Sequence, residues 1–323
     1  MFKKKWVIRV IIAIIMIIIL FFSSNEIIRQ IKSDSNNDNN ILNEYSDSFL
    51  DLYNLYYVLE SKKLINDLSN DELTNVKKEI ENYPIELVIE RGNLYDLWLY
   101  VQIHKFLEIK IPEKKEISDY LESLKTNEGF YLTYPGENEH GLSSHLLSTK
   151  MSLEIMNEIK EKIDYEQINN WIKENYEEDL SKLENDPISY VGAIYLIKFI
   201  QELTKQSNSK YIFDTDELGQ HLEKATGLLL MSEDNIMKYD TILEFNSLDN
   251  ENSIPINEKE VENYLLSIKH KSGGFPLWGL NDEEPDILTT YIALKLQKKL
   301  YLNIPISEVD KHFLDQTLEY IFE

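Results

Sequence analysis

Acidic side chains crowd one short segment of the chain, Asp282-Glu283-Glu284-Pro285-Asp286. Loop carboxylates at this density can collect around Ca²⁺. The same residues are also typical of a helix start, because Asp286 lies three residues before Thr289 and suits the N-cap position. We expect Asp286 to cap the helix that follows. Glu284 and Asp286 remain ligand-binding candidates with no metal assigned to them.

A second loop carries His140 and His145, close to Glu137 and Glu139. Two imidazoles and a carboxylate are the ligand types that zinc prefers. Their five-residue spacing matches no usual metal motif, and loop histidines are commonly exposed for no functional reason. We therefore predict no metal and no cofactor, and retain His140 as a ligand-contacting candidate.

Aromatic side chains flank both loops and the starts of several helices. They are Phe130, Tyr131 and Tyr134 on the first loop, Phe275 and Trp278 on the second, and Tyr95, Trp98, Tyr190 and Tyr239 near helix starts. Gathered at one end of the fold, such rings would line a cavity for an apolar chain, a stacked sugar or a peptide side chain. The alternative is that these rings fill the centre of the fold as packing residues.

Glycoside hydrolysis would need two facing carboxylates about 5–10 Å apart. The carboxylates expected at the loop end are Glu128, Glu137, Asp186, Asp240, Glu284 and Asp286. Because the chain holds 57 acidic residues, some pair will meet this distance by chance. The sequence has no Ser-His-Asp set, Gly-rich phosphate loop or H-E-x-x-H helix, so it identifies no catalytic residue.

These residues belong to a body, residues 46–323, in which apolar residues recur every three or four positions, as in helices. One junction recurs along it: an apolar helix ends, an Ile follows, and a polar-capped amphipathic helix begins. The junction residues are Ile65, Ile111, Ile163, Ile212, Ile254 and Ile304, at steps of 46, 52, 49, 42 and 50 residues. Pro follows three of them and suits the first turn of the second helix. The spacing predicts six helical hairpins.

The first helix of each hairpin is the more apolar one. These helices are expected near residues 48–62, 93–109, 143–160, 187–203, 236–247 and 286–302. The second helices carry most of the charge. Because a helix that is apolar nearly all round must be buried, the pattern predicts six inner helices inside six amphipathic ones. The expected fold is all-α, an (α/α)6 barrel.

Two loops that lead into inner helices share a sequence. One contains Thr126-Asn127-Glu128-Gly129-Phe130, and the other contains Lys271-Ser272-Gly273-Gly274-Phe275 before Asp286 and a Thr-Thr-Tyr helix start. This pattern resembles the repeat of the terpenoid cyclase and protein prenyltransferase superfamily, strongly over residues 261–302 and less so over 117–160. The resemblance implies an α/α toroid, a fold that enzymes and non-catalytic binding domains share.

The catalytic motifs of that superfamily are missing or altered in this chain. Its prenyltransferases hold zinc partly through a Cys, and this chain has none. Its triterpene cyclases use a D-x-D-D motif, to which Asp214-Thr215-Asp216-Glu217 is the nearest match, but these residues follow the junction at Ile212 and are explained as a helix cap. The segment 282–286 resembles the D-D-x-x-D motif of other prenyl enzymes, but Pro285 makes it a loop.

The N-terminus predicts a membrane anchor. Three lysines at positions 3–5 precede the apolar stretch 6–22, within which Arg9 can extend to the headgroups. The stretch is just long enough to span a bilayer, and the basic residues place the N-terminus in the cytoplasm. A cleaved signal peptide is the alternative, with Ser23 and Ser24 as a weak cleavage site.

Composition supports three segments: residues 1–24 as cytoplasmic tip and transmembrane anchor, residues 25–45 as a flexible polar linker, and residues 46–323 as an extracytoplasmic body. The net charge of −24 is uneven, because residues 1–32 hold six of the 33 basic residues and one of the 57 acidic residues, which leaves −29 to the remainder. No basic patch is available to bind nucleic acid. The absence of Cys excludes disulfides and a thiol nucleophile.

We therefore predict a protein of a bacterial cell surface that contacts the lipid bilayer through residues 6–22. Its body is expected to be a module that binds an unidentified ligand or protein and has no catalytic activity. A carbohydrate-active hydrolase or lyase is the alternative, and a terpenoid cyclase-like enzyme, implied by the resemblance alone, is a third. Whether the protein is an enzyme stays open in the sequence.

Overall fold

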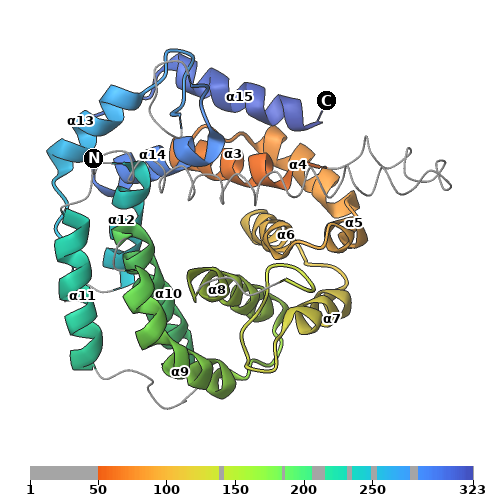
Figure 1. Cartoon of the computed structure of the whole chain (residues 1–323). Coiled ribbons are helices and arrows are strands. Elements are labelled where there is room, and N and C mark those ends of the chain that lie inside the picture. Colours follow the sequence, from red (N-terminus) through yellow and green to blue (C-terminus); the bar gives the residue numbers. More distant parts are fainter. Residues whose placement is uncertain are drawn as a thin grey trace, which may run out of the picture. The chain divides into compact units, whose positions relative to one another are not determined.

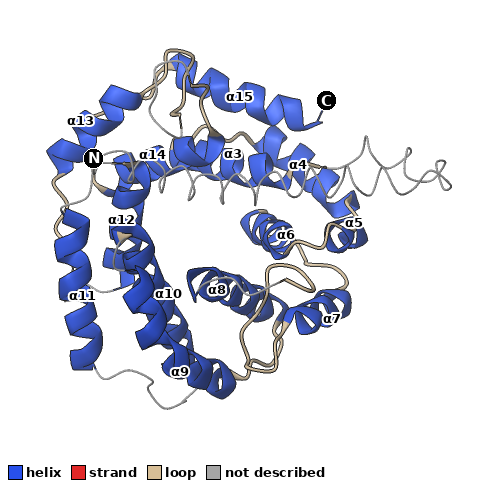
Figure 2. Cartoon of the chain, viewed as in Figure 1, coloured by secondary structure: helices blue, strands red, loops and turns tan. Residues whose placement is uncertain are grey.

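The computed structural model describes residues 50–137, 142–183, 186–205, 215–230, 235–248, 253–276 and 283–322. Over these residues the chain is all-α, as predicted, with two isolated β-bridges and no strand (Figures 1 and 2). All of these helices belong to one compact unit, Leu50–Glu323. The expected transmembrane segment and linker lie outside the described residues, and none of the described helices is long and apolar enough to cross a membrane.

Six helices pack against one another in a closed circuit. They are α3 (Leu52–Leu64), α6 (Leu94–Phe106), α8 (Leu142–Ile159), α10 (Pro187–Lys205), α12 (Ile236–Leu248) and α14 (Ile287–Lys299). Each packs on the next in chain order, and α14 packs on α3, which closes the circuit (Figure 1). Their ranges lie within a few residues of the six apolar helices expected from the sequence.

A second set of helices alternates with the first along the chain. These are α4 (Asn70–Asn82), α5 (Ile85–Glu90), α7 (Lys114–Leu124), α9 (Tyr165–Leu183), α11 (Thr215–Leu230), α13 (Glu258–Ile268) and α15 (Glu308–Phe322). They pack on the circuit: α7 on α8, α9 on α8 and α10, α11 on α10, and α15 on α3. The short helix α5, which packs on α6, was not predicted from the repeat.

The difference between the two sets follows from their residues. Helix α6 buries side chains on nearly every face, among them Leu97, Leu99 and Val101. Helix α7 buries Ile117, Tyr120, Leu121 and Leu124, which are three or four positions apart and form one face. A helix of the first kind needs neighbours all round, whereas one of the second kind needs a single apolar surface. The layered packing follows from this difference.

The two loops with a shared sequence also share their hydrogen bonds. Before α8, the Tyr131 N–H donates to Thr149 Oγ1 at 3.1 Å, and before α14 the Phe275 N–H donates to Thr290 Oγ1 at 3.0 Å. A second hydrogen bond also matches: the Thr126 N–H donates to the Phe130 carbonyl at 2.9 Å, and the His270 N–H donates to the Gly274 carbonyl at 3.1 Å. The structural equivalent of Phe275 is therefore Tyr131.

Glycine is required in both loops. Gly129 and Gly273 have positive φ angles of 101° and 88°, a backbone region that side chains disfavour. A Cβ at Gly273 would also overlap the backbone carbonyl of Val309 on α15, so the loop before α14 lies directly against the last helix. The glycines thus serve chain reversal and close packing.

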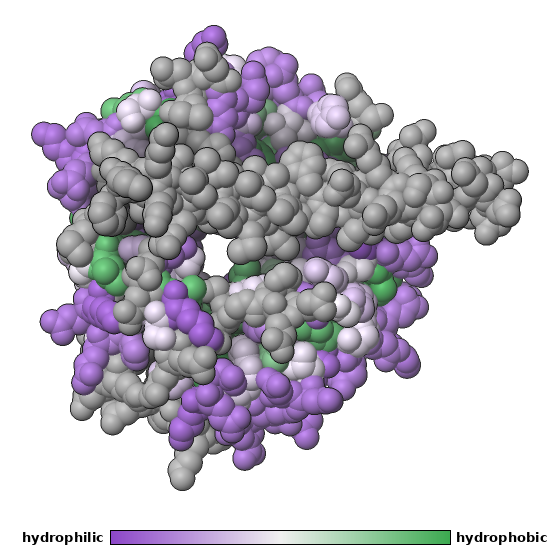
Figure 3. Space-filling model, in the orientation of Figure 1, coloured by the Kyte–Doolittle hydropathy of each residue, from purple (hydrophilic) through white to green (hydrophobic). Residues whose placement is uncertain are grey.

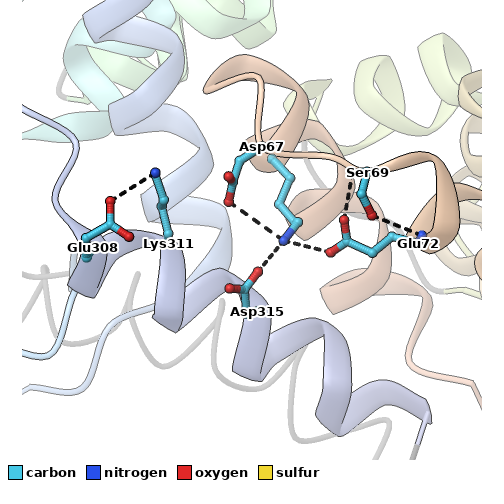
Figure 4. A network of polar contacts seen from close by, with 7 residues as sticks. Asp67, Ser69, Glu72, Glu308, Lys311 and Asp315 are labelled. Atoms are coloured by element: carbon cyan, nitrogen blue, oxygen red, sulfur yellow. Dashed lines mark hydrogen bonds and ion pairs between the residues drawn. The ribbon is translucent and has the colours of Figure 1, made fainter.

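A buried lysine ties the first hairpin to the last helix (Figure 4). The Lys62 side chain on α3 is 2% exposed. Its Nζ lies 2.8 Å from Glu72 Oε1 and 3.9 Å from Asp67 Oδ2. It also forms a close ion pair with Asp315 on α15. Glu72 also accepts from the Ser69 N–H at 2.7 Å in the capping box of α4. Three carboxylates compensate for the burial of this ammonium group.

Candidate functional site

The loop aromatics chosen from the sequence do not come together. Phe130 stacks on His145 at 4.3 Å between ring centroids and lies 4.8 Å from Trp171, between α8 and α9. Phe275 is 1% exposed and packs in a separate apolar cluster. Tyr134 is exposed. The first two rings therefore pack in two separate places, whereas the alternative left open by the sequence put these rings together at the centre of the fold. His140 and Trp278 lie outside the described residues.

The acidic loop before α14 is explained by helix capping. Asp286 Oδ1 accepts the N–H of Thr289 at 2.8 Å, so the predicted N-cap is confirmed. Glu284 is exposed. Within the described part of the chain no group of three or more His, Asp or Glu side chains is arranged to hold a metal ion.

Tyr95 and Trp98 on α6, by contrast, belong to a continuous group of rings. Their rings stack at 5.8 Å, and Trp98 meets the Tyr56 ring of α3 edge-on at 5.5 Å. Tyr56 in turn packs on Tyr57 at 5.0 Å, and Tyr53 packs on Tyr57 at 5.1 Å. Two neighbouring helices thus present a wall of five aromatic side chains.

This wall is one part of a larger set of side chains contributed by all six helices of the circuit, which we call the central cluster. Its members are Tyr53, Tyr56, Tyr57 and Glu60 on α3, Tyr95 and Trp98 on α6, Lys150 and Glu154 on α8, Tyr195 and Phe199 on α10, Asp240 and Glu244 on α12, and Tyr291 and Lys295 on α14. Contacts between these side chains join every pair of adjacent helices.

Three of these junctions run from α3 to α10. The hydroxyls of Tyr57 and Tyr95 are 2.8 Å apart and join α3 to α6. The Trp98 indole N–H donates to Glu154 Oε2 at 2.7 Å and joins α6 to α8. Lys150, next to Glu154 on α8, places its Nζ 4.9 Å from the centre of a phenyl ring on α10, that of Phe199.

The other three junctions complete the circuit through α12 and α14. The Tyr195 hydroxyl donates to Glu244 Oε2 at 3.3 Å, joining α10 to α12. Lys295 on α14 donates to Glu244 Oε1 at 2.7 Å and forms a close ion pair with Asp240. The Tyr291 ring, one turn before Lys295, lies 5.4 Å from that of Tyr57 and returns the circuit to α3.

Electrostatic effects also link side chains of the central cluster that belong to non-adjacent helices. Burial is the main cause that raises the pKa of Tyr56, and the charge of Glu154, two helices away on α8, adds to it. Burial likewise raises the pKa of Tyr57, with a contribution from Asp240 on α12, again two helices away. The space-filling view shows an opening near the middle of the circuit (Figure 3).

The ionisable groups of the central cluster differ in state. Burial raises the pKa of Tyr291 to about 12, so the phenol stays neutral and can donate hydrogen bonds. Burial alone would lower the pKa of Lys295, but Asp240 and Glu244 raise it instead. The pKa of Glu244 is lowered: burial opposes this, and the charge of Lys295 prevails. This ammonium and its carboxylate partner are therefore both charged at neutral pH. At Asp240 burial outweighs the charge of Lys295 and raises the pKa of the carboxyl group.

Glu60 is the second carboxyl of the central cluster with a raised pKa. Burial raises its pKa, and only Lys63 opposes the shift. Lys63 itself lies with its Nζ 4.6 Å from the centre of the Phe106 ring. The charge of Glu60 contributes to the raised pKa values of both Tyr56 and Tyr291, for which burial is the main cause. Across the part of the chain that the structure describes, Glu60 makes no ion pair.

The sequence contains a signal for this site that loop motifs do not reveal. Every helix of the circuit carries a pair of central-cluster residues three or four positions apart, which places both on one helix face. Helix α10 has Tyr195 and Phe199, and α12 has Asp240 and Glu244. Of the cluster, the sequence analysis had singled out Tyr95 and Trp98 for binding and Asp240 as a carboxylate.

The comparisons add no relative: the chain matches no protein-family model, no characterised protein and no solved structure.

Proposed function

We propose that residues 50–323 form an α/α toroid whose central cluster binds a small ligand, or a side chain of a partner protein, without transforming it. One observation carries the proposal. Side chains from six helices, most of them half-buried rings and carboxylates, converge inside a circuit that has an opening at its middle (Figure 3). Aromatic walls with a few fixed polar groups are typical of ligand sites.

The state of the carboxylates favours binding over catalysis. Glu154 accepts from Trp98 and Lys150, and Glu244 accepts from Tyr195 and Lys295. A general base must be able to accept a proton, and hydrogen bonds that stabilise the charged form oppose this. These groups therefore suit a fixed binding surface better than proton transfer.

A hydrolase or lyase is the second candidate function, and Glu60 is the observation that favours it. A carboxyl group with a raised pKa among aromatic rings is suited to act as a general acid. A glycosidase needs a second, facing carboxylate to act as base or nucleophile. The remaining carboxylates of the central cluster are engaged by ammonium or indole donors, so the second group required for this chemistry is not free.

The N-terminal part of the proposal rests on sequence. We propose that residues 6–22 anchor the chain in a membrane as a single pass and that the toroid lies on the outer side. The support is the apolar stretch preceded by lysines, and the change from a basic tip to residues 33–323, whose net charge is −29.

Because the natural chain has no Cys, access to the central cluster can be measured with one introduced thiol. Tyr195→Cys places it in the cluster, and Tyr301→Cys, at a residue 89% exposed, is the surface control. We expect a small neutral thiosulfonate to label both folded full-length variants at rates within about tenfold of each other. A thiol at position 195 that reacts only in denaturant would refute an open binding site.

A further inference from the structure

We infer that the ligand of the central cluster is an organic cation, held by the Glu60 carboxylate together with the Tyr56 and Tyr291 rings. The inference rests on the proposed function, since it names the class of ligand for the same site. It follows from three features of the cluster: how the chain's own ammonium groups are held there, which carboxylate lacks such a partner, and the net charge.

The central cluster already holds two ammonium groups in the same manner. Lys295 places its Nζ 5.5 Å from the centre of the Tyr291 ring and 2.7 Å from a Glu244 oxygen. Lys150 combines the Phe199 ring with a Glu154 oxygen at 3.1 Å. A ring face and a carboxylate together compensate an ammonium for the water it loses, because both attract positive charge.

Among the described residues, no ammonium group is bound to a third combination of carboxylate and rings. Glu60 lies four positions after Tyr56 and three after Tyr57, so the three side chains share one face of α3, and the Tyr57 ring lies 5.4 Å from that of Tyr291. In agreement with this placement, the charge of Glu60 contributes to the raised pKa values of Tyr56 and Tyr291, for which burial is the main cause. Tyr56 also contacts Trp98 and Tyr57, so two further rings stand beside it. The combination of a carboxylate with neighbouring rings that holds Lys295 and Lys150 is therefore also present at Glu60, where we assign the place of the cation to a ligand.

The charge of the central cluster favours the same class of ligand. Its four carboxylates and two ammonium groups give a net charge of −2 when all are ionised. The cluster contains no Arg, the side chain best suited to clamp a phosphate or carboxylate. Like charges in a partly dehydrated site repel strongly, so diphosphates and acidic sugars are disfavoured.

The test compares a cation with a neutral molecule of the same shape. Choline and 3,3-dimethylbutan-1-ol differ mainly in that a quaternary nitrogen replaces a carbon. We expect isothermal titration of the full-length chain in a non-ionic detergent to give choline an affinity at least about tenfold higher. Glu60→Gln should abolish this preference. Glu116→Gln, at an exposed carboxylate of α7, is the matched control and should retain it.

Other outcomes separate this inference from the proposed function. Equal affinity for both probes, or a preference that Glu60→Gln leaves unchanged, overturns the cation inference while the binding site stands. Binding of methyl β-glucoside with no binding of choline has the same meaning and indicates a neutral sugar. If no probe binds, the inference is overturned as well. Labelling of the thiol at position 195 then tests the proposed function. If the thiol is labelled, the open binding site is retained and only the cation inference fails. If it does not react, the proposed function and the cation inference both fail.

Discussion

Lys295 offers the most direct test of how the central cluster is held together. Its Nζ joins α14 to two carboxylates of α12, and the side chain is 12% exposed. In Lys295→Met the aliphatic part and its packing against Tyr291 are retained, while the ammonium group is lost. Asp240 and Glu244 are then left as neighbouring negative charges with no cation between them. The variant should fold, but with a less stable α12–α14 contact.

The magnitude follows from the burial of each partner. Removing one member of a buried ion pair costs about 3–5 kcal/mol. Asp240, at 17% side-chain exposure, belongs in this range, whereas Glu244, at 37%, can turn to water and adds little. We expect a loss of about 3 kcal/mol at pH 7. For a body of this size that corresponds to a melting temperature lower by about 6–10 °C.

The loss should depend on pH. In the natural chain Lys295 lowers the pKa of Glu244 against the effect of burial. The Glu244 carboxylate therefore stabilises the fold at pH values above its unfolded pKa. This contribution is lost as the pH falls through the folded pKa of Glu244. Without Lys295, burial raises the folded pKa of both carboxyls, and the variant loses stability as pH rises through those values. The difference between the two proteins should therefore shrink below about pH 5.

The assay is thermal and urea unfolding of the full-length chain in a mild detergent, followed by circular dichroism between pH 4.5 and 8. Lys299→Met, at an exposed lysine on the same helix, should change stability by less than about 0.5 kcal/mol. Adding Asp240→Asn to Lys295→Met should recover at least half of the loss. A loss below about 1 kcal/mol, or one that is the same at pH 4.5 and pH 7, would refute the reasoning.

Three further outcomes are expected. Lys62→Met removes the ammonium group that Glu72 and Asp315 surround and should lower the free energy of unfolding by about 2–3 kcal/mol, measured by urea unfolding. The loss is smaller than for a fully buried pair because both carboxylates reach water. An unchanged free energy of unfolding would show that these ion pairs do not stabilise the fold. Thr149→Val and Thr290→Val each leave a buried loop N–H without its acceptor and should cost about 1–3 kcal/mol by the same assay; a large difference between them would contradict the equivalence of the loops. Tyr301→Cys in intact bacterial cells should react with a membrane-impermeant maleimide; labelling only after lysis would contradict an outward-facing body.

Much of the fold was predictable because its causes are local. Apolar helices that end at an Ile junction, which Pro follows in three cases, specify their own boundaries, and the six helices of the circuit lie close to the ranges expected from that pattern. The N-cap at Asp286 was predictable for the same reason, since a cap needs only the residues of one turn. Helix α5 was missed because six residues between two longer helices give no usable periodicity.

The site was less predictable because its position depends on closure of the circuit. In a helix that is buried on every side, the periodicity of apolar residues does not indicate which face points inward. Tyr and Trp count as apolar in such patterns, so they do not mark that face either. The prediction therefore turned to loops, where exposed rings and carboxylates are conspicuous. Phe130 and Phe275 proved to be packing residues, whereas the spaced pairs of the inner helices became informative only once α14 was seen to return to α3.

Closure of the circuit also explains why the centre is built from tyrosines and ion pairs rather than from leucines. The closed circuit of six helices has an opening near its middle, and empty apolar space is costly (Figure 3). Long side chains with polar ends can span part of that space and satisfy one another, as Trp98 does with Glu154 and Lys295 does with Glu244. What remains unfilled is then lined by fixed polar groups and ring faces. The packing requirements of the fold thus favour a preorganised arrangement of ring faces and polar groups, and Glu60, which makes no ion pair among the described residues, is where we propose that a ligand completes it.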